Sequence, residues 1–550
     1  MATMQSSLVI APPRSAMSTS IQPFSRPAAP PDAPGRGTKA FILGTASATC
    51  SLIVLDTNVV AVSLPAIART FQASFADVEW VVSAYMVAFA SCLLPAGGLA
   101  DRLGRKRMML AGLAVFLLAS VGCGLASTAT FLNVARAVKG VGAAMLLTAA
   151  LAIIANTFHE GAERTRAWAV WGTCMGVTTT IAPLVGGVIT QWAGWRWIFL
   201  INVPVCLMLV ACVRYAMTES RNPAASRIDA LGSALFGVAL MLGIWALIDI
   251  PAHGWASLAT GSRFGAAAVL LALFVLHERA TAHAMIDLSL FRQPRFVGAV
   301  LGMFGYAACA QVMMTFLPLY LQNAFEMSAV QAGVGMLPFA LAMIVGPYLG
   351  ARLSSRFHGS SSVLVAGLML IGAGNLLVAA VATHAHYGLV AVGMIVTGLG
   401  AGVMNGDTQK AIMACVPVHR TGMASGISTT TRFSAIVTAV GVLGAVLASR
   451  TERAFEAALP AGFAWRDALG ADFLARVLAG DIGQAIAQAI APLDAAARAS
   501  TATKASQAFA SGFGAALGVA GVVALVLGAT VWSLYRAGRG PAVPIVDQQR

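Results

Sequence analysis

Apolar runs separated by short polar connections fill most of the chain after residue 40. Each run is about 20 residues long or longer, which is the length that an α-helix needs to cross a bilayer. The pattern therefore predicts an all-α membrane protein with about 14 transmembrane helices. The expected spans are 41–64, 78–100, 108–127, 131–155, 167–191, 197–216, 230–250, 262–278, 296–323, 330–351, 362–382, 388–406, 420–448 and 511–535.

Two segments interrupt this pattern. Residues 1–39 are rich in Pro, Ser and Ala and lack periodicity, so we expect a disordered tail there. Residues 450–510 form the one long connection expected on the outer side, and an Ala-rich part of it has apolar residues at helical spacing. We expect one or two amphipathic helices in this connection. They would either pack as a cap on the bundle or help to capture substrate.

Composition and charge agree with a membrane protein. The chain is 58% hydrophobic and 10% charged, whereas a soluble domain carries about 25% charged residues. The net charge of +14 would suit nucleic acid, but most basic residues lie in short connections on the side of the N-terminus. This is the positive-inside distribution, so we expect the lipid bilayer as partner, no nucleic acid, and both termini in the cytoplasm.

One acid, Asp56, lies inside the first apolar run, and it is the acid that we expect well inside a helix of the N-terminal half. Arg136 and Lys139 lie at a comparable depth of the fourth run, three residues apart and so on one helical face. Ionisable residues within a membrane are costly and usually functional. Two hypotheses remain open: an acid whose proton is exchanged during work, and a permanent ion pair that fixes helix packing.

Other features are less decisive. Gly172 with Gly176, and Gly398 with Gly402, have the spacing that allows close helix contact. Three polar residues near the later spans are candidates for a gate or a second charge site, and they can equally be satisfied locally. These residues are Asp407, Lys410 and Arg432.

The sequence indicates no enzyme. The segment HERATAH does not fit the zinc motif H-E-x-x-H, and no phosphate-binding loop is present. The eight cysteines lie singly in apolar runs without paired spacing. We therefore predict no catalytic residue, metal site or cofactor.

The connection GGLADRLGRKR, Gly97 to Arg107, resembles the loop signature of the major facilitator superfamily. The resemblance implies a gating loop, in which the acid and an arginine form a charge network with the end of a neighbouring helix and help to hold one access state. The residues that carry the resemblance most clearly are Gly97, Asp101, Arg102, Gly104, Arg105, Lys106 and Arg107.

Two further motifs resemble the 14-helix drug:proton antiporter branch of that family. LDTNVVAVSLP, Leu55 to Pro65, is similar to the helix-1 signature, with Asn58 as a departure, and Lys139 replaces the usual Gln of helix 4. APLVGG is similar to the antiporter motif of helix 5 through Pro183, Gly186 and Gly187, although Ala182 replaces its first Gly.

The resemblance implies two six-helix bundles, 40–216 and 296–535, with a linker and two inserted helices at 217–295 and a cytoplasmic tail at 536–550. It further implies a proton-coupled exporter of small amphiphilic molecules in a bacterial inner membrane. Asp56, Arg136, Lys139 and Asn58 would serve proton coupling and the substrate cavity. The alternatives are an exporter of an anionic metabolite, and a membrane sensor or assembly protein with the same fold. A periplasmic adaptor or outer-membrane channel as partner is left open.

Overall fold

The computed structural model of the protein describes residues 36–537 apart from a few short gaps. The predicted terminal tails lie mostly outside the described residues, except that residues 36–39 are helical and begin α1. The gaps are 159–160, 221–228, 255, 282–287, 358–359, 385, 406, 417–420, 461–468, 471–472, 481 and 488–494.

The described chain contains 14 helices that are long and apolar enough to cross a membrane, which confirms the predicted fold class. The N-terminal helices are α1 (Arg36–Phe71), α2 (Phe75–Leu103), α3 (Arg105–Gly124), α4 (Ala129–Thr157), α5 (Gly161–Trp192), α6 (Trp197–Leu200) and α7 (Asn202–Ala216). Two more follow, α8 (Ala230–His253) and α9 (Leu258–Ala280).

The C-terminal half is less regular. Its ninth span is one run in the sequence, but a π-helical turn interrupts it at η2. The elements are η1 (Leu288–Arg292), α10 (Pro294–Tyr306), η2 (Ala307–Gln311), α11 (Met313–Ala324), α12 (Ala329–Gly335), α13 (Leu337–Phe357), α14 (Ser360–Val381), α15 (Tyr387–Met404), α16 (Asp407–Met413), α17 (Thr421–Ala457), α19 (Phe473–Leu478), α20 (Ile482–Ala487) and α21 (Ala495–Ala537).

Short polar side chains set several helix starts. Ser74 and Asp77 form a capping box at the start of α2, and Thr128 accepts a hydrogen bond from the backbone of Phe131 at the start of α4. Such caps satisfy backbone N–H groups that have no partner inside the helix. They fix where the apolar runs become helical at this end of the bundle.

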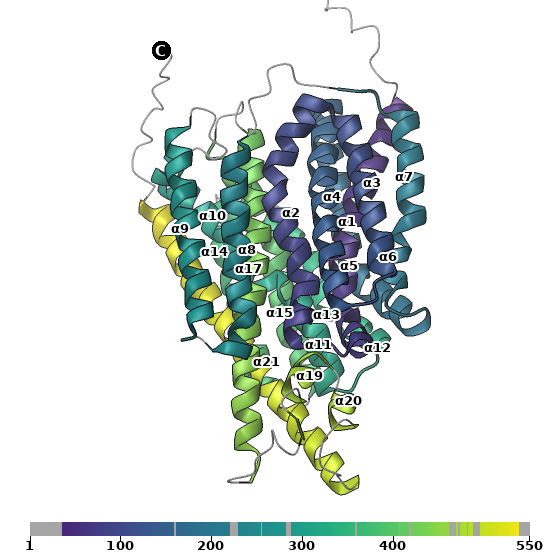
Figure 1. Ribbon diagram of the computed structural model, residues 1–550. Helices are drawn as coiled ribbons and strands as arrows, with labels where there is room; N and C mark the ends of the chain where they lie inside the picture. The colour runs from purple at the N-terminus through teal and green to yellow at the C-terminus, as the bar shows by residue number, and fades with distance from the viewer. Residues whose placement is uncertain are drawn as a thin grey trace, which may run out of the picture.

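Helices α1–α7 form one bundle and the elements from α10 onward form the other (Figure 1). Helix α8 contacts both bundles, since Gly237 packs on Ser91 of α2 and Gly441 of α17 packs on Leu247 of α8. Helix α9 packs on α8 and leaves most of its surface exposed, with only 11% of its most apolar window buried. Its apolar side chains are therefore suited to face lipid.

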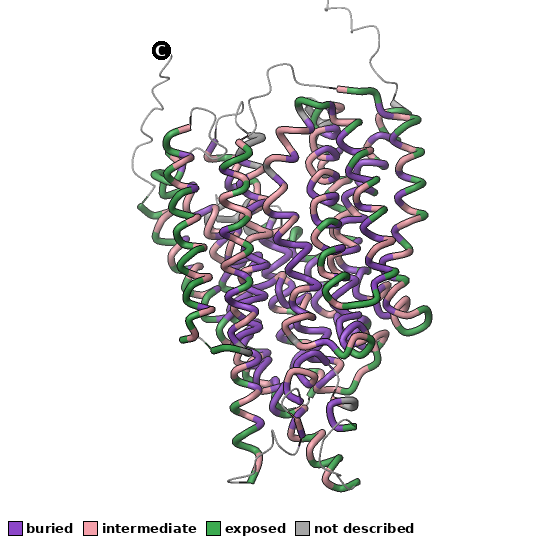
Figure 2. Tube along the Cα trace, in the orientation of Figure 1, coloured by how far each residue is buried: buried purple, intermediate pink, exposed green. Residues whose placement is uncertain are grey.

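The two ends of the molecule differ. Helix α1 begins and α21 ends at one end, whereas α19, α20 and the extended ends of α17 and α21 lie at the other (Figure 1). Buried positions concentrate in the centre and toward the end that carries α19 (Figure 2). We call α19 and α20 the cap, and the end that carries them the cap end.

Candidate functional site

A buried ion triad lies inside the N-terminal bundle. The Asp56 carboxylate of α1 accepts hydrogen bonds from Arg136 Nη1 at 2.8 Å and from Lys139 Nζ at 2.5 Å, both on α4. Asn202 of α7 donates a third bond at 3.1 Å. The three charged side chains are at most 2% exposed. The structure thus brings together the residues that the sequence placed at similar depths, and it adds Asn202.

Aromatic rings and one backbone carbonyl complete the surroundings of the two bases. Arg136 donates from Nε to the carbonyl oxygen of Val81 at 2.9 Å, and its guanidinium lies 4.3 Å from the ring centre of Tyr85. Lys139 Nζ lies 4.6 Å from the ring centre of Phe116. Two cations against one anion leave a net positive charge, and the negative faces of the rings stabilise it in part.

The triad does not line the space between the bundles. A small cavity of about 70 Å³ lies there, bounded by α1, α2 and α5 on one side and by η2, α11 and α17 on the other. Thr57 and Asn58 of α1 face it, whereas Asp56 points to the opposite side of that helix. Of the four residues predicted for coupling and the substrate cavity, only Asn58 lines the cavity, and the triad lies behind it.

The cavity has its own base, Arg432 of α17. Its Nε donates to Gln311 Oε1 at 2.7 Å, and its guanidinium lies 5.7 Å from the ring centre of Tyr306. Among the described residues, no carboxylate pairs with it. Asp407 and Lys410 pair with each other at 3.0 Å in α16 and are not brought to Arg432. Of the three secondary candidates, Arg432 is therefore the one that faces the cavity.

The predicted gating loop is anchored by an acid that the sequence analysis did not single out. Glu219, which follows α7, accepts hydrogen bonds from the backbone N–H groups of Lys106 and Arg107 at 3.1 and 3.2 Å. These N–H groups open α3, so Glu219 acts as the anionic cap of that helix. Gly104 has a φ of 110° and lies directly beside the Glu219 carboxylate, where a side chain would collide with it.

The remaining residues of the gating loop surround this cap. Gly97 faces Thr148 of α4, and the Arg105 N–H donates to the carbonyl oxygen of Ser220 at 3.0 Å. Arg102 is exposed. The side chain of Asp101, the predicted acid of the charge network, lies outside the described residues. The network that is seen joins the loop to the end of α7.

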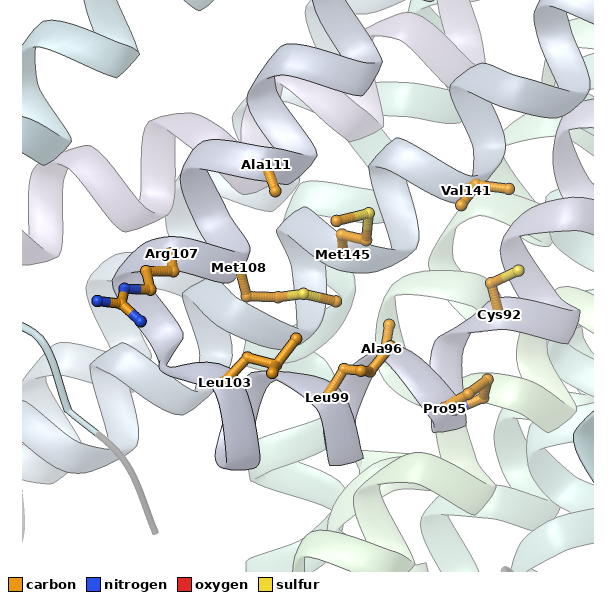
Figure 3. Close-up of a pocket in the computed structure, with 10 residues that line it drawn as sticks. All are labelled: Cys92, Pro95, Ala96, Leu99, Leu103, Arg107, Met108, Ala111, Val141 and Met145. Atoms are coloured by element: carbon orange, nitrogen blue, oxygen red, sulfur yellow. The ribbon is translucent and has the colours of Figure 1, made fainter. Parts of the chain in front are cut away.

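Beside this loop, an apolar groove of about 420 Å³ runs between α2, α3 and α4 (Figure 3). Leu99, Met108 and Met145 line it, and Arg107 is the charged residue at its rim. Because all three helices belong to one bundle, this groove does not lie between the two bundles. The cavity beside Arg432 is the better candidate for a substrate path.

The bundles meet closely near the cap end. Gln322 of α11 donates to the carbonyl oxygen of Val62 at 3.1 Å, and the backbone of Val330 donates to Gln191 at 3.3 Å. Gly187 of α5 packs on the backbone of Ala329, and Gly333 of α12 packs on the carbonyl of Pro183. A β-carbon at either glycine would collide with the other bundle. Two residues of the predicted antiporter motif, Pro183 and Gly187, thus lie at the bundle interface.

Gly186, the third residue of that motif, and the predicted glycine pairs make no close contact with the other bundle. Gly186 packs on Val59 within the N-terminal bundle. Gly172 and Gly176 have nothing within 4 Å of an added β-carbon, so the predicted close contact of this pair is wrong. Gly398 and Gly402 do pack against the backbone of α13. At Gly172 and Gly176, α5 therefore has no close neighbour on the glycine side, whereas at Gly187 it touches the other bundle.

The N-terminal half contains a second buried acid that the sequence pattern did not reveal. Glu79 lies near the start of α2 and is 3% exposed, so Asp56 is not the one interior acid of this bundle. Because the predicted apolar run begins only one residue before Glu79, hydropathy does not distinguish a buried acid there from one at a solvated helix end. Asn202 and Gln311 are polar residues inside apolar runs, and this position was the sequence signal that could have identified them as functional.

Comparison with known proteins bears on this arrangement. The family model described as Major Facilitator Superfamily matches residues 46–440. The multidrug resistance protein Stp of Mycobacterium tuberculosis is 35% identical over 399 residues, covering 72% of this chain and 74% of Stp. The methylenomycin A resistance protein of Streptomyces coelicolor is 33% identical over 405 residues, covering 73% and 84% of the two chains.

A third relative, the tetracenomycin C resistance and export protein of Streptomyces glaucescens, is 32% identical over 406 residues, covering 74% and 75%. Among solved structures, a bacterial homolog of the human lysosomal transporter Spinster, inward-facing and unoccupied, matches with a TM-score of 0.61. It is 16% identical and covers 91% of this chain and 99% of that chain. At this identity the match speaks for the fold alone.

Proposed function

The chain belongs to the Major Facilitator Superfamily and is a transporter rather than an enzyme, and from that premise we propose that it exports small amphiphilic drugs in exchange for protons. The names of the relatives, which describe multidrug resistance, antibiotic resistance and export, support drugs as the substrate class. We propose that the protein lies in a bacterial inner membrane, with both termini in the cytoplasm. The positive-inside distribution of basic residues supports this orientation.

The observation that best supports proton coupling is the buried triad of Asp56, Arg136 and Lys139. Asp56 is a carboxylate held between two cations, away from water and directly behind the cavity residues Thr57 and Asn58. A change in the distance to either cation changes the affinity of the carboxylate for a proton. Motion of α1 against α4 would therefore convert a conformational step into proton binding or release.

Alternating access is supported by the asymmetry between the two ends. With the proposed orientation, the bundles touch at the outer end, whereas Gly172 and Gly176 in the inner half of α5 have no atom within 4 Å of an added β-carbon. This corresponds to a state open toward the cytoplasm, where a drug would bind beside Asn58 and Arg432. Opening at the outer end would then require α1 and α5 to part from α11 and α12.

Proton-driven flux in proteoliposomes tests this function. Asp56→Asn alone would leave two unbalanced buried cations. The informative variant is therefore the double change Asp56→Asn/Lys139→Gln, in which Arg136 remains and the net charge of the site is the same as in the parent. We expect it to bind drug but to show neither export against a gradient nor proton release on drug addition. The control is Lys139→Gln, which keeps the Asp56–Arg136 pair and should still couple. Drug-induced proton release by the double variant at the parental level would refute Asp56 as the coupling acid.

A second candidate function, export of anionic molecules, is favoured by one observation. Arg432 faces the cavity, and no carboxylate among the described residues pairs with it. An unbalanced guanidinium attracts a carboxylate or phosphate and repels a cation. The sensor alternative, which rested on weak C-terminal motifs, loses support because the family match continues to residue 440.

A further inference from the structure

The buried acid Glu79 of α2 takes no part in the triad and has no hydrogen-bond partner among the described residues. It is 3% exposed, and within the described chain neither carboxyl oxygen has a hydrogen-bond partner. Buried polar groups in proteins are nearly always hydrogen-bonded, so an orphaned carboxyl group calls for a physical reason.

Glu79 lies in the seam between the bundles. Its carboxyl group is directed at Gly444 of α17, and it would collide with any β-carbon at that position. Helix α2 belongs to the N-terminal bundle and α17 to the C-terminal one, and α2 also contacts α19 of the cap. The group therefore occupies a space that exists only while the two bundles are closed at the cap end.

The charged side chains on the surrounding elements do not neutralise it. Those of the triad bond to one another, Asp77 bonds to Ser74, and Asp249 pairs with Arg263 and His253. None of the others donates to Glu79. The charged residues and histidines with described side chains on the helices packed against α2 are Lys39, Asp56 and Arg69 on α1, Arg136 and Lys139 on α4, Asp249 and His253 on α8, Arg432, Arg450, Glu452, Arg453 and Glu456 on α17, Arg476 on α19, and the three bases that open α3 at the far end.

A carboxylate in such a place would be a desolvated charge without a donor or a cation, which is among the costliest arrangements in a protein. The neutral acid avoids the cost of a buried charge and leaves only the smaller cost of an unpaired polar group. We propose that Glu79 is a second proton-binding site, a latch that holds one proton while the α2–α17 seam is closed and releases it to the outside when the seam opens.

This latch differs from the coupling acid in what its proton does, and it rests on the proposed alternating-access function. The proton arrives from the outer side and returns to the outer side, because the seam that buries Glu79 opens only there. It is not carried across the membrane. An acidic exterior therefore favours closure of the outer end, and an alkaline exterior favours opening.

Distance measurements between spin labels test the latch. Cysteines are introduced at Ser127 and Thr383, exposed positions in outer connections of the two bundles, in a chain whose eight native cysteines are replaced. In lipid nanodiscs without drug, the parent should show one population of molecules at the open distance and one at the closed distance. The ratio of the open to the closed population should rise with pH, by up to tenfold per pH unit, because one proton is released per opening. In Glu79→Gln, which mimics the neutral acid, the ratio should stay constant.

Two controls separate the latch from other acids and from the coupling function. Asp249→Asn removes an outer acid that already has a cationic partner, and it should keep the parental pH response. Asp56→Asn/Lys139→Gln should lose coupled export but also keep that response, so the two proposals fail independently. If Glu79→Gln follows pH as the parent does, or if the parental distances do not change with pH, Glu79 is not a latch.

Discussion

Charge balance governs the centre of the N-terminal bundle at the scale of single residues. Among the described residues, Asp56 is the one carboxylate that bonds to Arg136 and Lys139, and all three are buried. Removing the acid would leave two like charges beside ring faces, the Val81 carbonyl and the Asn202 amide, with no anion to balance them among the described residues. Removing Lys139 would leave a neutral pair. The stability of the bundle should therefore respond in opposite ways to the two changes.

We predict that Asp56→Asn destabilises the protein by about 3–5 kcal/mol, the usual cost of breaking a buried ion pair. Lys139→Gln should unfold at the parental temperature or above it, because it removes the unbalanced cation. The measurement is the apparent melting temperature in one detergent at matched purity. A melting temperature of Asp56→Asn equal to the parent's would mean that water reaches the triad.

Substrate charge preference should follow Arg432 and not Lys139. Arg432 lines the cavity, whereas Lys139 is fully buried behind it. We expect Arg432→Gln to raise the ratio of cationic to anionic drug transport by roughly tenfold, the effect of about 1.4 kcal/mol of repulsion at an effective dielectric typical of protein sites. Lys139→Gln is the matched control and should leave the ratio unchanged. Transport of a cationic and an anionic dye, measured side by side in the same proteoliposomes, gives the ratio directly, and equal shifts in both variants would contradict the assignment.

At the scale of helices, the apolar pattern predicts the spans because membrane helices must satisfy their own backbone hydrogen bonds, which makes length and hydropathy decisive. It does not reveal the π-helical turn at η2, where an extra residue aims Gln311 at Arg432. Nor does it reveal the contact between Glu219 and the start of α3, which joins residues more than a hundred positions apart. Contacts of this kind depend on how the helices pack, and packing leaves little trace in a single sequence.

The start of α3 should depend on this distant cap. We predict that Glu219→Gln weakens the hydrogen bonds to the N–H groups of Lys106 and Arg107 and costs about 1 kcal/mol, as loss of a helix cap does. Hydrogen exchange of the peptide that joins α2 to α3 should become severalfold faster. The control is Glu163→Gln, which removes another exposed acid paired with a base, Lys39, at 3.1 Å. Unchanged exchange in Glu219→Gln would show that backbone packing alone holds the loop.

For the whole molecule, the cap ties the two bundles together at one end. Asn323 of α11 donates to the carbonyl oxygen of Val477 in α19 at 3.1 Å, and Gly480 packs on Pro65 of α1. One short segment thus touches both bundles, on the same side as the close contacts of α5 with α12. The hypothesis that residues 450–510 pack against the bundle agrees with these contacts. Opening of this end requires the cap to leave at least one bundle.

Gly480 offers a way to loosen the cap without touching the cavity. Its φ is 99°, a backbone conformation that favours glycine, and an added β-carbon would lie 2.8 Å from the ring carbons of Pro65. We predict that Gly480→Ala costs about 1 to 2 kcal/mol in the cap and raises the population of molecules open at this end. The matched control is Gly194→Ala, since Gly194 has a φ of 89° but nothing within 4 Å of an added β-carbon. Labels at Ser127 and Thr383 should report longer distances in Gly480→Ala alone. If both variants behave alike, backbone strain explains the effect, and the contact between the cap and α1 does not hold this end closed.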